Sequence, residues 1–597
     1  MAVCGGFCVS HRNLLVLFFS IVAALRSGAA TQKLDKDGIT VEFLQPDSVV
    51  EGKDAQLRFA IRAADGTPLT GIRPAAWIDA KGSVSCRDKI QSFLGGTLRA
   101  RPQVDLNTYY ILTLDAEPSV AVIDPLVGFG GSKLLTAVTL QSPGVDWVLS
   151  PDQKRLFVAM PLVNRVAVID TGTWSVVKNI EVGVKPTRLA LRDALWVLAD
   201  ATASVIDVST LQVTRNIDIG KGPHQIAFDE TNVYVTMQSP LPAARGEGRV
   251  RGVDADALAY SPLSDSVYAI DTETGVISVV GTDTRIQAKP GINSIQFAPG
   301  GRWGFITNAK DNSVLVLDAS TAKIVSTATN AGAHPDQIAF TDAFAYVRAA
   351  GSDHVKLIRL ASLATDAEVS MAAFPAGQLP PAAAKAESFA AAIVPAPEPK
   401  AVLVANPADR TVYYYMEGMA APMGNFVAKG RTPKAVLVLD RSLREEQPSV
   451  FSIRTSVPAA GHYDVAFFMN EPRVVHCFDL AVAADPNAPA KAVARTVKIE
   501  PMLAQKSIRA GQEVEVKFRL TDTATSELRR DARDVRALAF LAPGIWQKRV
   551  PAEPDADGLY RVKFTVPEPG IYYMFLESPS LNVRMNKTRP VIFEATP

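Results

Sequence analysis

The sequence is poor in cysteine and histidine, and its charges almost cancel. It holds 4 cysteines and 6 histidines among 597 residues, and 62 basic residues stand against 61 acidic ones. A chain without a basic excess lacks the electrostatic surface that attracts nucleic acids and anionic membranes. We therefore expect no nucleic acid among its partners. The motif Cys-x-x-Cys-His is absent as well, which excludes covalently attached c-type haem.

Sequence motifs of the common catalytic sites are also missing. There is no Gly-x-Ser-x-Gly nucleophile turn, no phosphate-binding P-loop and no His-Glu-x-x-His zinc motif. No catalytic residue can be named from the sequence, so the chain is more typical of a binding protein than of an enzyme.

Only one apolar run needs to be considered as a membrane segment. It comprises residues 14–25 and follows Arg12, and it is shorter than the roughly 20 residues of a spanning helix. A short apolar run between a basic residue and the small residues 28–30 is typical of a secretory signal peptide. We predict that residues 1–30 are this signal peptide. After cleavage no integral membrane segment should remain, and the mature protein should be periplasmic or secreted.

Two cysteines remain in the mature chain. Cys4 and Cys8 fall within the predicted signal peptide, which leaves Cys86 and Cys477. In an oxidising compartment, two cysteines most simply form a disulfide. This pairing would tie the N-terminal part of the chain to its C-terminal part. Two free thiols or a metal thiolate are the alternatives.

The strongest signal in the sequence is an internal repeat. An apolar strand that ends in aspartate recurs with spacings of 46, 37, 64 and 47 residues between the aspartates. These strands end at Asp124, Asp170, Asp207, Asp271 and Asp318. A second phrase, Gly-Pro-His-Gln-Ile-Ala-Phe at 222–228 and His-Pro-Asp-Gln-Ile-Ala-Phe at 334–340, runs in phase with the first.

Each repeat unit reads as four short strands rich in valine, isoleucine and aromatic residues. Such a unit of about 40 residues, repeated around an axis, is a propeller blade. We therefore predict an all-β fold whose centre is a β-propeller of about seven blades, at residues 105–426. Counts of six or eight blades stay open.

With these phrases in view, the repeat resembles a known family. The aspartate-ended strands, the Gly-Pro-x-x-Ile-Ala-Phe phrase and Ser150-Pro151-Asp152 ahead of Leu156 are similar to bacterial YVTN-type propeller repeats. That family is similar in fold to the haem d1 domain of cytochrome cd1-type nitrite reductase and to the heavy chain of methylamine dehydrogenase. The resemblance covers residues 107–419. It implies a propeller but no single function, because propellers host many unrelated tasks.

A noncovalent haem d1 is the cofactor that this resemblance raises. It would need an axial ligand, and the predicted propeller holds three histidines, His224, His334 and His354. His224 and His334 fall in the repeated phrase at different offsets, so we interpret them as structural turn residues. A haem d1-type propeller stays a further alternative.

Alternating strands flank the repeats on both sides. A turn followed by strict alternation occurs at 51–61 and again at 510–520, as expected for strands with one buried face. A glycine, one residue and a tyrosine precede alternating strands after residue 460, a pattern that resembles the tyrosine corner of immunoglobulin-like sandwiches. We predict immunoglobulin-like sandwich modules at 31–104, 427–490 and 491–597.

Two units of the repeat are stretched by long insertions, at residues 238–265 and 372–399. Long loops in compact domains usually carry a function or lack order. The first insertion contains Arg245, Arg249 and Arg251. These arginines belong either to a solvated loop or to a lid over one face of the propeller.

Metal binding is the one chemical function for which residues can be named. The candidates carry sulfur or imidazole donors: Met416, Met419, Met423, His462, His476 and Cys477. Thioether sulfur selects Cu(I) over harder ions, so copper is the expected metal. His476 and Cys477 are neighbours on a predicted hairpin and face opposite sides, and the register decides which one shares a face with His462. In the alternative interpretation the methionines pack against blade edges, Cys477 pairs with Cys86, and the histidines are structural.

These observations lead to hypotheses from different classes. The first is an exported, non-catalytic binding or scaffolding protein that presents its propeller surface to a protein partner or a small ligand. The second is a periplasmic copper-binding or redox accessory protein that uses the methionine-rich segment with the nearby histidines and cysteine. The third is the haem d1-type propeller.

Overall fold

A computed structural model of the chain describes residues 30–597, with the exception of 95–101, 126–132, 223, 238–249, 365–368, 380–387, 429, 487–496, 504–506, 523–524, 526, 543–545, 556–557, 579–580, 582 and 584–589. The chain divides into two compact units: Met1–Asn107 with Arg441–Ala492, and Thr108–Asp440 with Val493–Pro597. The predicted signal peptide lies outside the described residues, apart from Ala30. No helix in the described part is long and apolar enough to cross a membrane.

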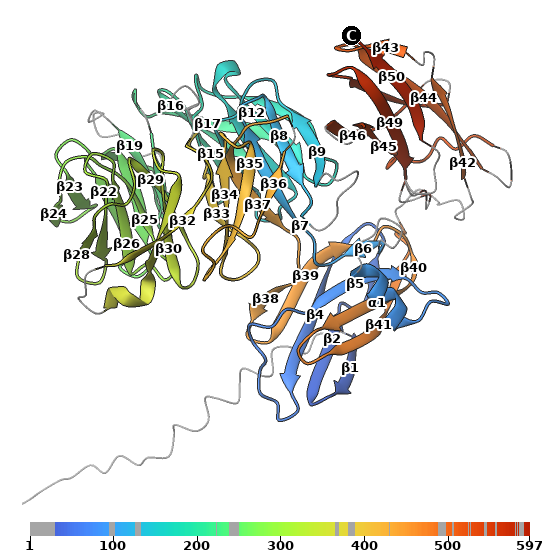
Figure 1. Cartoon of the computed structure of the whole chain (residues 1–597), viewed down its shortest axis with the longest axis horizontal. Helices are drawn as coiled ribbons and strands as arrows, with labels where there is room; N and C mark the ends of the chain where they lie inside the picture. Colours follow the sequence, from blue (N-terminus) through green and yellow to red (C-terminus); the bar gives the residue numbers. More distant parts are fainter. Residues whose placement is uncertain are drawn as a thin grey trace, which may run out of the picture. The chain divides into compact units, whose positions relative to one another are not determined.

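The first unit is a sandwich of two five-stranded sheets (Figure 1). One sheet has the order β1 (Ala30–Lys36), β2 (Ile39–Gln45), β4 (Asp54–Ala63), β39 (Val450–Ser456) and β38 (Arg444–Gln447). The other has the order β3 (Val49–Val50), β41 (Val474–Ala483), β40 (Gly461–Met469), β5 (Ala75–Ala80) and β6 (Val104–Asp105), and helix α1 (Cys86–Leu94) follows β5 in the chain. Each sheet thus combines strands from two segments that lie far apart in the sequence.

This sandwich corrects the predicted modules, which placed one sandwich at 31–104 and another at 427–490. Strand β39 pairs with β4, with Phe451 opposite Phe59, and β40 pairs with β5. The N-terminal segment supplies only β5 as a strand longer than two residues to the second sheet. Because a sheet needs about three strands to be stable, this segment cannot close a sandwich alone. The two segments therefore fold as one module.

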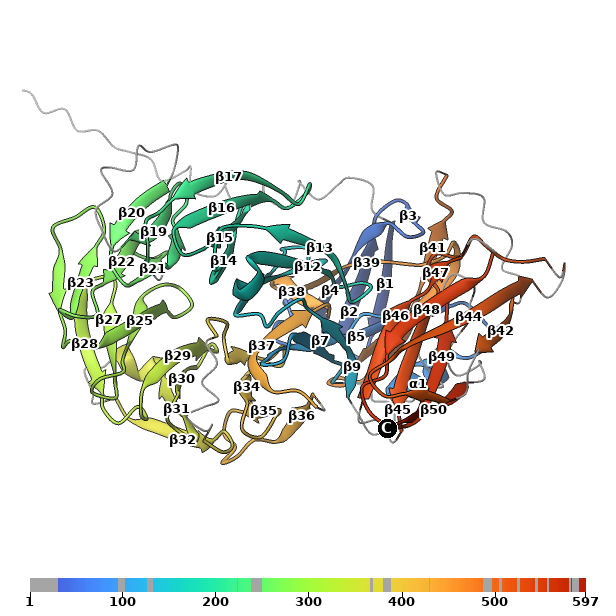
Figure 2. The same ribbon diagram turned by 90° about the horizontal axis from the view of Figure 1, so that it is seen from above.

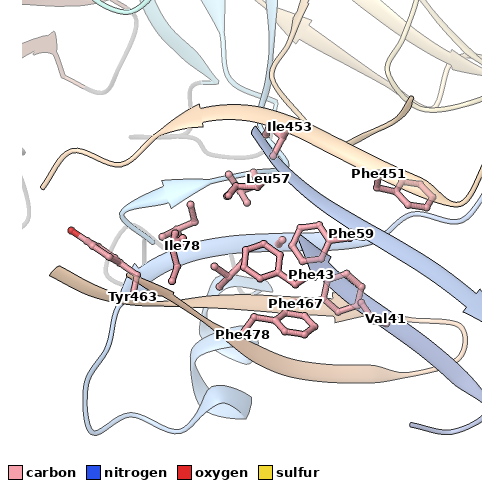
Figure 3. Packing of buried hydrophobic residues seen from close by; sticks show 14 of the residues in the cluster. Val41, Phe43, Leu57, Phe59, Ile78, Phe451, Ile453, Tyr463, Phe467 and Phe478 are labelled. Carbon is pink, nitrogen blue, oxygen red and sulfur yellow. The ribbon is translucent and has the colours of Figure 1, made fainter. Parts of the chain in front are cut away.

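Four phenylalanines form the centre of this core, two from each segment (Figure 3). The ring centroids of Phe43 and Phe59 are 5.0 Å apart. The Phe59 ring lies 5.1 Å from Phe467, and the Phe43 ring lies 5.3 Å from Phe478. All four side chains are buried. Burial of each ring contributes roughly 1.5–3 kcal/mol, so the segments depend on each other for their stability.

A disulfide also joins the two segments, on the face of the second sheet that points away from the core. Cys86 is the first residue of α1, and its sulfur is bonded to that of Cys477 on β41, with 5.8 Å between the Cα atoms. Close by, Nζ of the buried Lys89 lies 2.6 Å from Oδ2 of Asp464 on β40. Helix α1 is therefore held on this sheet by a covalent bond and an ion pair.

The second unit contains a ring of eight small sheets, which we call blades 1 to 8 (Figure 2). Blade 1 consists of β37 (Pro433–Asp440), β7 (Tyr109–Asp115), β8 (Ser119–Ile123) and β9 (Leu134–Thr139), and blade 2 of β10 (Asp146–Leu149), β11 (Arg155–Met160), β12 (Arg165–Asp170) and β13 (Ser175–Glu181). Blade 3 consists of β14 (Arg188–Leu191), β15 (Leu195–Leu198), β16 (Thr202–Asp207) and β17 (Gln212–Asp218), and blade 4 of β18 (Ile226–Phe228), β19 (Val233–Met237) and β20 (Val250–Asp254).

Blades 5 to 8 continue around the ring. Blade 5 consists of β21 (Ala257–Ser261), β22 (Ser266–Ile270), β23 (Val276–Val279) and β24 (Arg285–Gln287), and blade 6 of β25 (Ile292–Phe297), β26 (Trp303–Asn308), β27 (Ser313–Asp318) and β28 (Lys323–Ala328). Blade 7 consists of β29 (Pro335–Phe340), β30 (Phe344–Ala349), β31 (His354–Arg359) and β32 (Met371–Pro375), and blade 8 of β33 (Ile393–Pro395), β34 (Ala401–Asn406), β35 (Thr411–Met416) and β36 (Gly424–Val427). Short 3-10 helices η3 (Pro161–Val163) and η4 (Leu360–Ala364) follow β11 and β31.

The described residues form eight blades where the repeat spacing predicted about seven. After the last strand of blade 3, the long interval between Asp207 and Asp271 contains the three described strands of blade 4 and the first two strands of blade 5, rather than one stretched unit. The strand that leads to Asp271 is the second strand of its blade, whereas the strands at Asp170 and Asp318 are third strands. Because the repeated phrase marks a different strand there, counting it misses one sheet.

Strand β37 closes the ring, because it follows blade 8 in the chain but pairs with β7 of blade 1. The pairing runs antiparallel from Pro433 opposite Asp115 to Asp440 opposite Tyr109. The ring therefore extends to Asp440, beyond the predicted boundary at residue 426. A blade built from both ends of the ring locks it by main-chain hydrogen bonds, since no sheet edge is left at the joint.

The remaining part of the second unit is another sandwich. One sheet has the order β42 (Val497–Leu503), β44 (Glu513–Asp522), β48 (Tyr560–Thr565) and β47 (Glu553–Pro554). The other has the order β43 (Ser507–Arg509), β50 (Val591–Thr596), β49 (Gly570–Glu577), β45 (Arg536–Leu541) and β46 (Trp546–Pro551). Inside it the rings of Tyr572 and Phe593 stack with centroids 5.4 Å apart. The Tyr572 hydroxyl donates to the carbonyl of Glu568 at 2.8 Å, which fixes the turn before β49.

Candidate functional site

The predicted copper ligands are divided between the two units. Met416 is the last residue of β35, and Met419 and Met423 lie in the turn that follows, with exposed fractions of 47% and 56%. His462, His476 and Cys477 belong to the hairpin β40–β41 of the first unit. No single unit brings the thioethers together with an imidazole or a thiol of this set.

The hairpin itself has the register that puts Cys477 and His462 on one face. Ala466 lies opposite Cys477 and Phe467 opposite His476, so the turn is centred between Glu471 and Pro472. His476 points to the other face, with its ring centroid 4.6 Å from that of Phe478. Burial lowers the pKa of His476, helped by the nearby charge of Lys36.

Cys477 does not fit a copper site in this structure. Its sulfur is bonded to Cys86, so it has no thiolate to offer a metal, which corrects its prediction as a ligand. Among the described residues, no group of three or more histidine, cysteine, aspartate and glutamate side chains lies close enough to hold an ion. The methionine set alone stays a prediction from the sequence.

The three histidines of the ring lie in turns or at a strand start. Both ring nitrogens of the buried His224 are within hydrogen-bond distance of carbonyl oxygens, Nδ1 of Thr236 at 2.7 Å and Nε2 of Gly220 at 3.0 Å. Nδ1 of His334 lies 3.1 Å from the carbonyl oxygen of Ala309. His354 begins β31, and its Nδ1 contacts the neighbouring Asp353 carboxylate at 2.7 Å. His224 has no nitrogen left for a haem iron, and all three make local contacts.

The axis of the ring is occupied by the chain's own residues 388–392, which precede β33. Arg188 of blade 3 donates from Nη1 to the carbonyl of Phe389 at 2.8 Å. Gln337 of blade 7 donates to the carbonyl of the next residue, Ala390, at 3.2 Å. Blades 3 and 7 face each other across a ring of eight. Two adjacent residues that bond to opposite blades must lie at the axis.

Further main-chain contacts fix this axial segment. The carbonyl of Val145, just before β10, accepts from the N–H of Phe389 at 2.8 Å. The N–H of Val436 on β37 donates to the carbonyl of Ala391 at 2.9 Å. The guanidinium of Arg188 also lies 4.7 Å from the centre of the Phe389 ring. At the end where the inner strands begin, the described chain thus fills the place where many propellers would be open.

A buried charge lies behind the axial segment. Asp146 accepts the N–H groups of Trp147 and Leu189 at 2.9 Å and 2.8 Å. Burial raises the pKa of Asp146 to about 6, against the opposing effect of the nearby Arg188 charge. Burial in turn lowers the pKa of Arg188. These two groups are used within the ring to position inner strands rather than to face solvent.

A second buried carboxylate lies where the ring closes. Asp115 at the end of β7 accepts hydrogen bonds from the hydroxyls of Thr113 and Ser119, both at 2.7 Å. Nε of Arg431 lies 3.8 Å from Oδ2 of Asp115. Burial raises the pKa of Asp115 to about 7, although the two hydroxyls and Arg431 oppose the rise.

The variant Asp115→Asn will gain stability relative to wild type as the pH rises. The folded pKa of Asp115 lies above its unfolded value, so its contribution to stability is full below about pH 4 and is lost as the pH rises through about 7. Asparagine stays neutral throughout. We expect the difference in unfolding free energy between variant and wild type to grow by about 4 kcal/mol from pH 4 to pH 8. Urea unfolding at both pH values measures it, and a pH-independent difference would contradict it.

A cleft of about 330 Å³ lies between blades 3 and 4 of the described ring. Its wall on blade 3 consists of Arg192, Asp193, Ala194, Trp196, Val205 and Arg215. Its wall on blade 4 consists of Phe228, Val233 and Val250. Small-molecule sites typically span about 300–1,000 Å³ and combine apolar walls with a few polar groups. This cleft meets both conditions.

The two walls are rows of side chains at one level of neighbouring sheets. On blade 3, Trp196 lies opposite Val205, and Val205 opposite Arg215. On blade 4, Phe228 lies opposite Val233, and Val233 opposite Val250 in parallel pairing. The cleft arises because the described part of blade 4 has only three strands. Its row of side chains ends at Val250, whereas the row on blade 3 continues over one more strand to Arg215.

Arg192 is fixed at the edge of the cleft. Its guanidinium donates to the carbonyl of Asp229 and, at 3.1 Å, to that of Glu230, and it lies 5.4 Å from the centre of the Phe228 ring. Nε of Arg192 is 3.6 Å from the exposed carboxylate of Asp193. Arg192 therefore bridges the two blades and forms part of the wall.

A smaller hollow lies between blades 7 and 8, beside Arg348 and Asn406. Its volume of about 30 Å³ is that of roughly one water molecule. Asn406 already donates to the carbonyls of Ala376 and Gln378 at 2.7 Å and 2.9 Å. This hollow is too small for an organic ligand, so of the two hollows the cleft between blades 3 and 4 is the candidate site.

The sequence reasoning did not identify the cleft residues. Trp196 and Val205 fall in strands that the repeat predicts, but their facing partners are visible only in three dimensions. The long interval between Asp207 and Asp271 was the available signal, since it marks the irregular blade 4. The predicted lid residues Arg245 and Arg249 lie outside the described residues, and Arg251 is exposed on β20.

No protein-family model matches the chain, and no curated protein matches it. Among solved structures it is similar to apo AztD from Citrobacter koseri, with 13% identity, a TM-score of 0.43, and coverage of 56% of this chain and 98% of that one. It is also similar to dihydro-haem d1 dehydrogenase NirN, with 10% identity, a TM-score of 0.35, and coverage of 63% and 74%. For the Cps50 (Swd1) β-propeller domain of Myceliophteria thermophila the values are 10%, 0.32, 53% and 97%. These similarities concern the propeller fold and carry no argument about function.

Proposed function

We propose that this chain is an exported binding protein and that the cleft between blades 3 and 4 is its ligand site. The cleft itself carries the proposal, because its volume of about 330 Å³ suits a small molecule and its walls combine apolar and charged side chains. The axial segment at 388–392 supports this choice, since Arg188 and Gln337 at the axis already bond to the chain itself.

The chemistry of the walls favours recognition over catalysis. The nine described residues that line the cleft carry guanidinium, carboxylate, aromatic or aliphatic side chains. Hydroxyl, thiol and imidazole groups, which supply most nucleophiles and bases, are not among these nine. The proposed role is therefore to hold a ligand without changing it.

Export is supported by two features of the chain. The leader at residues 1–30 has the pattern of a secretory signal peptide. The disulfide between Cys86 and Cys477 suits an oxidising compartment. We propose a periplasmic or secreted location, where the two sandwiches would act as a scaffold.

Filling the cleft will weaken small-molecule binding. Ala194 is half-buried in the cleft wall, so Ala194→Phe places a ring in the space that a ligand needs. Saturation-transfer NMR of the mature chain with a library of acidic, basic and neutral fragments measures binding. We expect a set of fragments that bind the wild type and lose at least about tenfold in affinity in this variant, since a steric clash readily costs 1.4 kcal/mol.

The matched control is Ala373→Phe, at an exposed position of strand β32 of blade 7. This variant adds the same ring away from the cleft and should bind the same fragments as the wild type. Fragments that bind equally well to Ala194→Phe, or a library without any binder, would count against the proposed site. Thermal unfolding of both variants checks that neither has lost its fold.

A further inference from the structure

The row of side chains on blade 3 has a counterpart on blade 2. There, Phe157 lies opposite Val168, and Val168 opposite Lys178, in the positions that Trp196, Val205 and Arg215 occupy on blade 3. The register shifts by a bulge directly after Val168 on blade 2 and directly after Val205 on blade 3. The two rows are therefore equivalent by position, and each ends in a basic residue.

The two basic residues differ in what they meet on the next blade. Nζ of Lys178 donates at 2.7 Å to the carbonyl of Leu211, in the turn between β16 and β17 of blade 3. Blade 4 has no such turn in its described part, because β20 is its third strand and runs parallel to β19. Arg215 is exposed, and its guanidinium has no hydrogen bond or ion pair with any described residue.

A guanidinium that has no partner among the described residues and lies at the edge of an apolar cleft suits an anion. It offers five N–H donors in a planar fork that matches a carboxylate. The walls carry two arginines and one aspartate, so the lining has an excess of one positive charge. Arg192 already donates hydrogen bonds to two carbonyl oxygens, so Arg215 is the basic group that would bind a ligand.

The rest of the cleft suits a flat apolar body. Trp196 is 6% exposed and packs in one apolar cluster with Val205, Val233 and the partly buried Phe228, so only part of its ring can meet a ligand. On blade 2 the equivalent Phe157 is fully covered by blade 3 side chains such as Leu195. An aromatic ring of a ligand placed against Trp196 would gain both apolar burial and ring stacking.

We propose that the cleft binds a small aromatic organic acid, with its carboxylate on Arg215 and its ring against Trp196. This inference rests on the proposed function and gives the ligand class of the same site. It involves no covalent step, since the ligand is held by charge, hydrogen bonds and apolar contact.

The test is calorimetric titration of the mature full-length chain with phenylacetate, its neutral analogue phenylacetamide, and acetate. We expect phenylacetate to bind. Phenylacetamide should bind about tenfold more weakly, because it lacks the negative charge that attracts the guanidinium, and acetate should give no measurable binding because it lacks a ring. Added salt should weaken the binding of phenylacetate but not that of phenylacetamide.

Substitutions at the two equivalent positions assign the effect. Arg215→Gln should weaken phenylacetate binding about tenfold and leave phenylacetamide binding unchanged. Glutamine keeps an N–H donor for either ligand and removes only the positive charge that attracts the carboxylate. Lys178→Gln is the matched control on blade 2 and should change neither affinity. Equal affinities of the acid and the amide, no detectable phenylacetate binding, or an Arg215→Gln variant that binds like the wild type would each overturn the inference.

The cleft-filling variant separates this inference from the proposed function. Basic fragments, or neutral fragments that bind as tightly as their acids, would uphold the cleft as a ligand site if they bind the wild type but not Ala194→Phe, while overturning the organic acid as its ligand class. Phenylacetate that binds Ala194→Phe as well as the wild type would be bound elsewhere, and both proposals would fail.

Discussion

A chain that ends at Asp440 will keep its ring of blades and lose the first sandwich. The truncation leaves β37 in place, so the ring still closes, but it removes β38 to β41. Phe467 and Phe478 leave the core with these strands. Loss of one buried phenylalanine typically costs about 3–5 kcal/mol, and the whole stability of a domain is about 5–15 kcal/mol. The remaining N-terminal strands therefore cannot stay folded.

Limited proteolysis followed by mass spectrometry measures this result. We expect rapid cleavage throughout residues 31–105 and a resistant fragment that spans 108–440. The control is a chain that ends at Pro486, which retains β38 to β41 and Cys477 and loses only the C-terminal sandwich. Its N-terminal segment should resist the protease as in the full chain. A resistant N-terminal segment in the shorter chain would show that this segment folds alone.

The same contacts explain why the sequence predicted the ring well and the first sandwich poorly. A blade is built from strands that are neighbours in the chain, so its period and alternation are visible in the sequence. The first sandwich pairs Phe59 with Phe451, and all the residues of the ring lie between these two in the sequence. No local pattern encodes such a pairing, and each half carries the same alternation that a separate module would have. Two modules were therefore predicted where one exists.

The irregular part of the ring shows a similar limit. The interval between Asp207 and Asp271 was visible as an anomaly, but the parallel pairing of β20 with β19 was not. Parallel neighbours need a long connection, which a reader of the sequence sees only as an insertion. The cleft depends on this pairing, so Arg215 looked like any other basic residue on a strand edge. For the copper set, the sequence left open whether Cys477 or His476 shares a face with His462. The register places Cys477 there, but the bond of Cys477 to Cys86 removes it as a ligand.

The variant Arg188→Met will destabilise the second unit by about 3 kcal/mol at pH 8. Methionine keeps much of the side-chain volume but removes the donor to the Phe389 carbonyl and the contact with its ring. It also removes the positive charge that favours the ionised form of the buried Asp146. A hydrogen bond is worth about 1 kcal/mol, and a buried charge that loses its compensating neighbour costs several more.

The pH dependence distinguishes lost charge from lost packing. The folded pKa of Asp146 is already raised to about 6, and without Arg188 it should rise further. Stability tied to a raised carboxyl pKa is full below the unfolded value near 4 and is lost as the pH rises through the folded value. The penalty of Arg188→Met should therefore be smaller at pH 5 than at pH 8, as measured by urea unfolding at both values.

The double variant Arg188→Met, Asp146→Asn tests whether the charge of Asp146 causes the loss of stability. Asparagine carries no charge to bury, so it should recover part of the loss at pH 8 and remove most of its pH dependence. Recovery should stay incomplete, because the asparagine side chain has one oxygen to accept the two N–H groups of Trp147 and Leu189 that Asp146 accepts with two. If Arg188→Met costs the same at both pH values and Asp146→Asn recovers nothing, the axial contacts are held by packing alone. A pH-dependent penalty with partial rescue would instead show that the charge of Arg188 stabilises the axis of the ring.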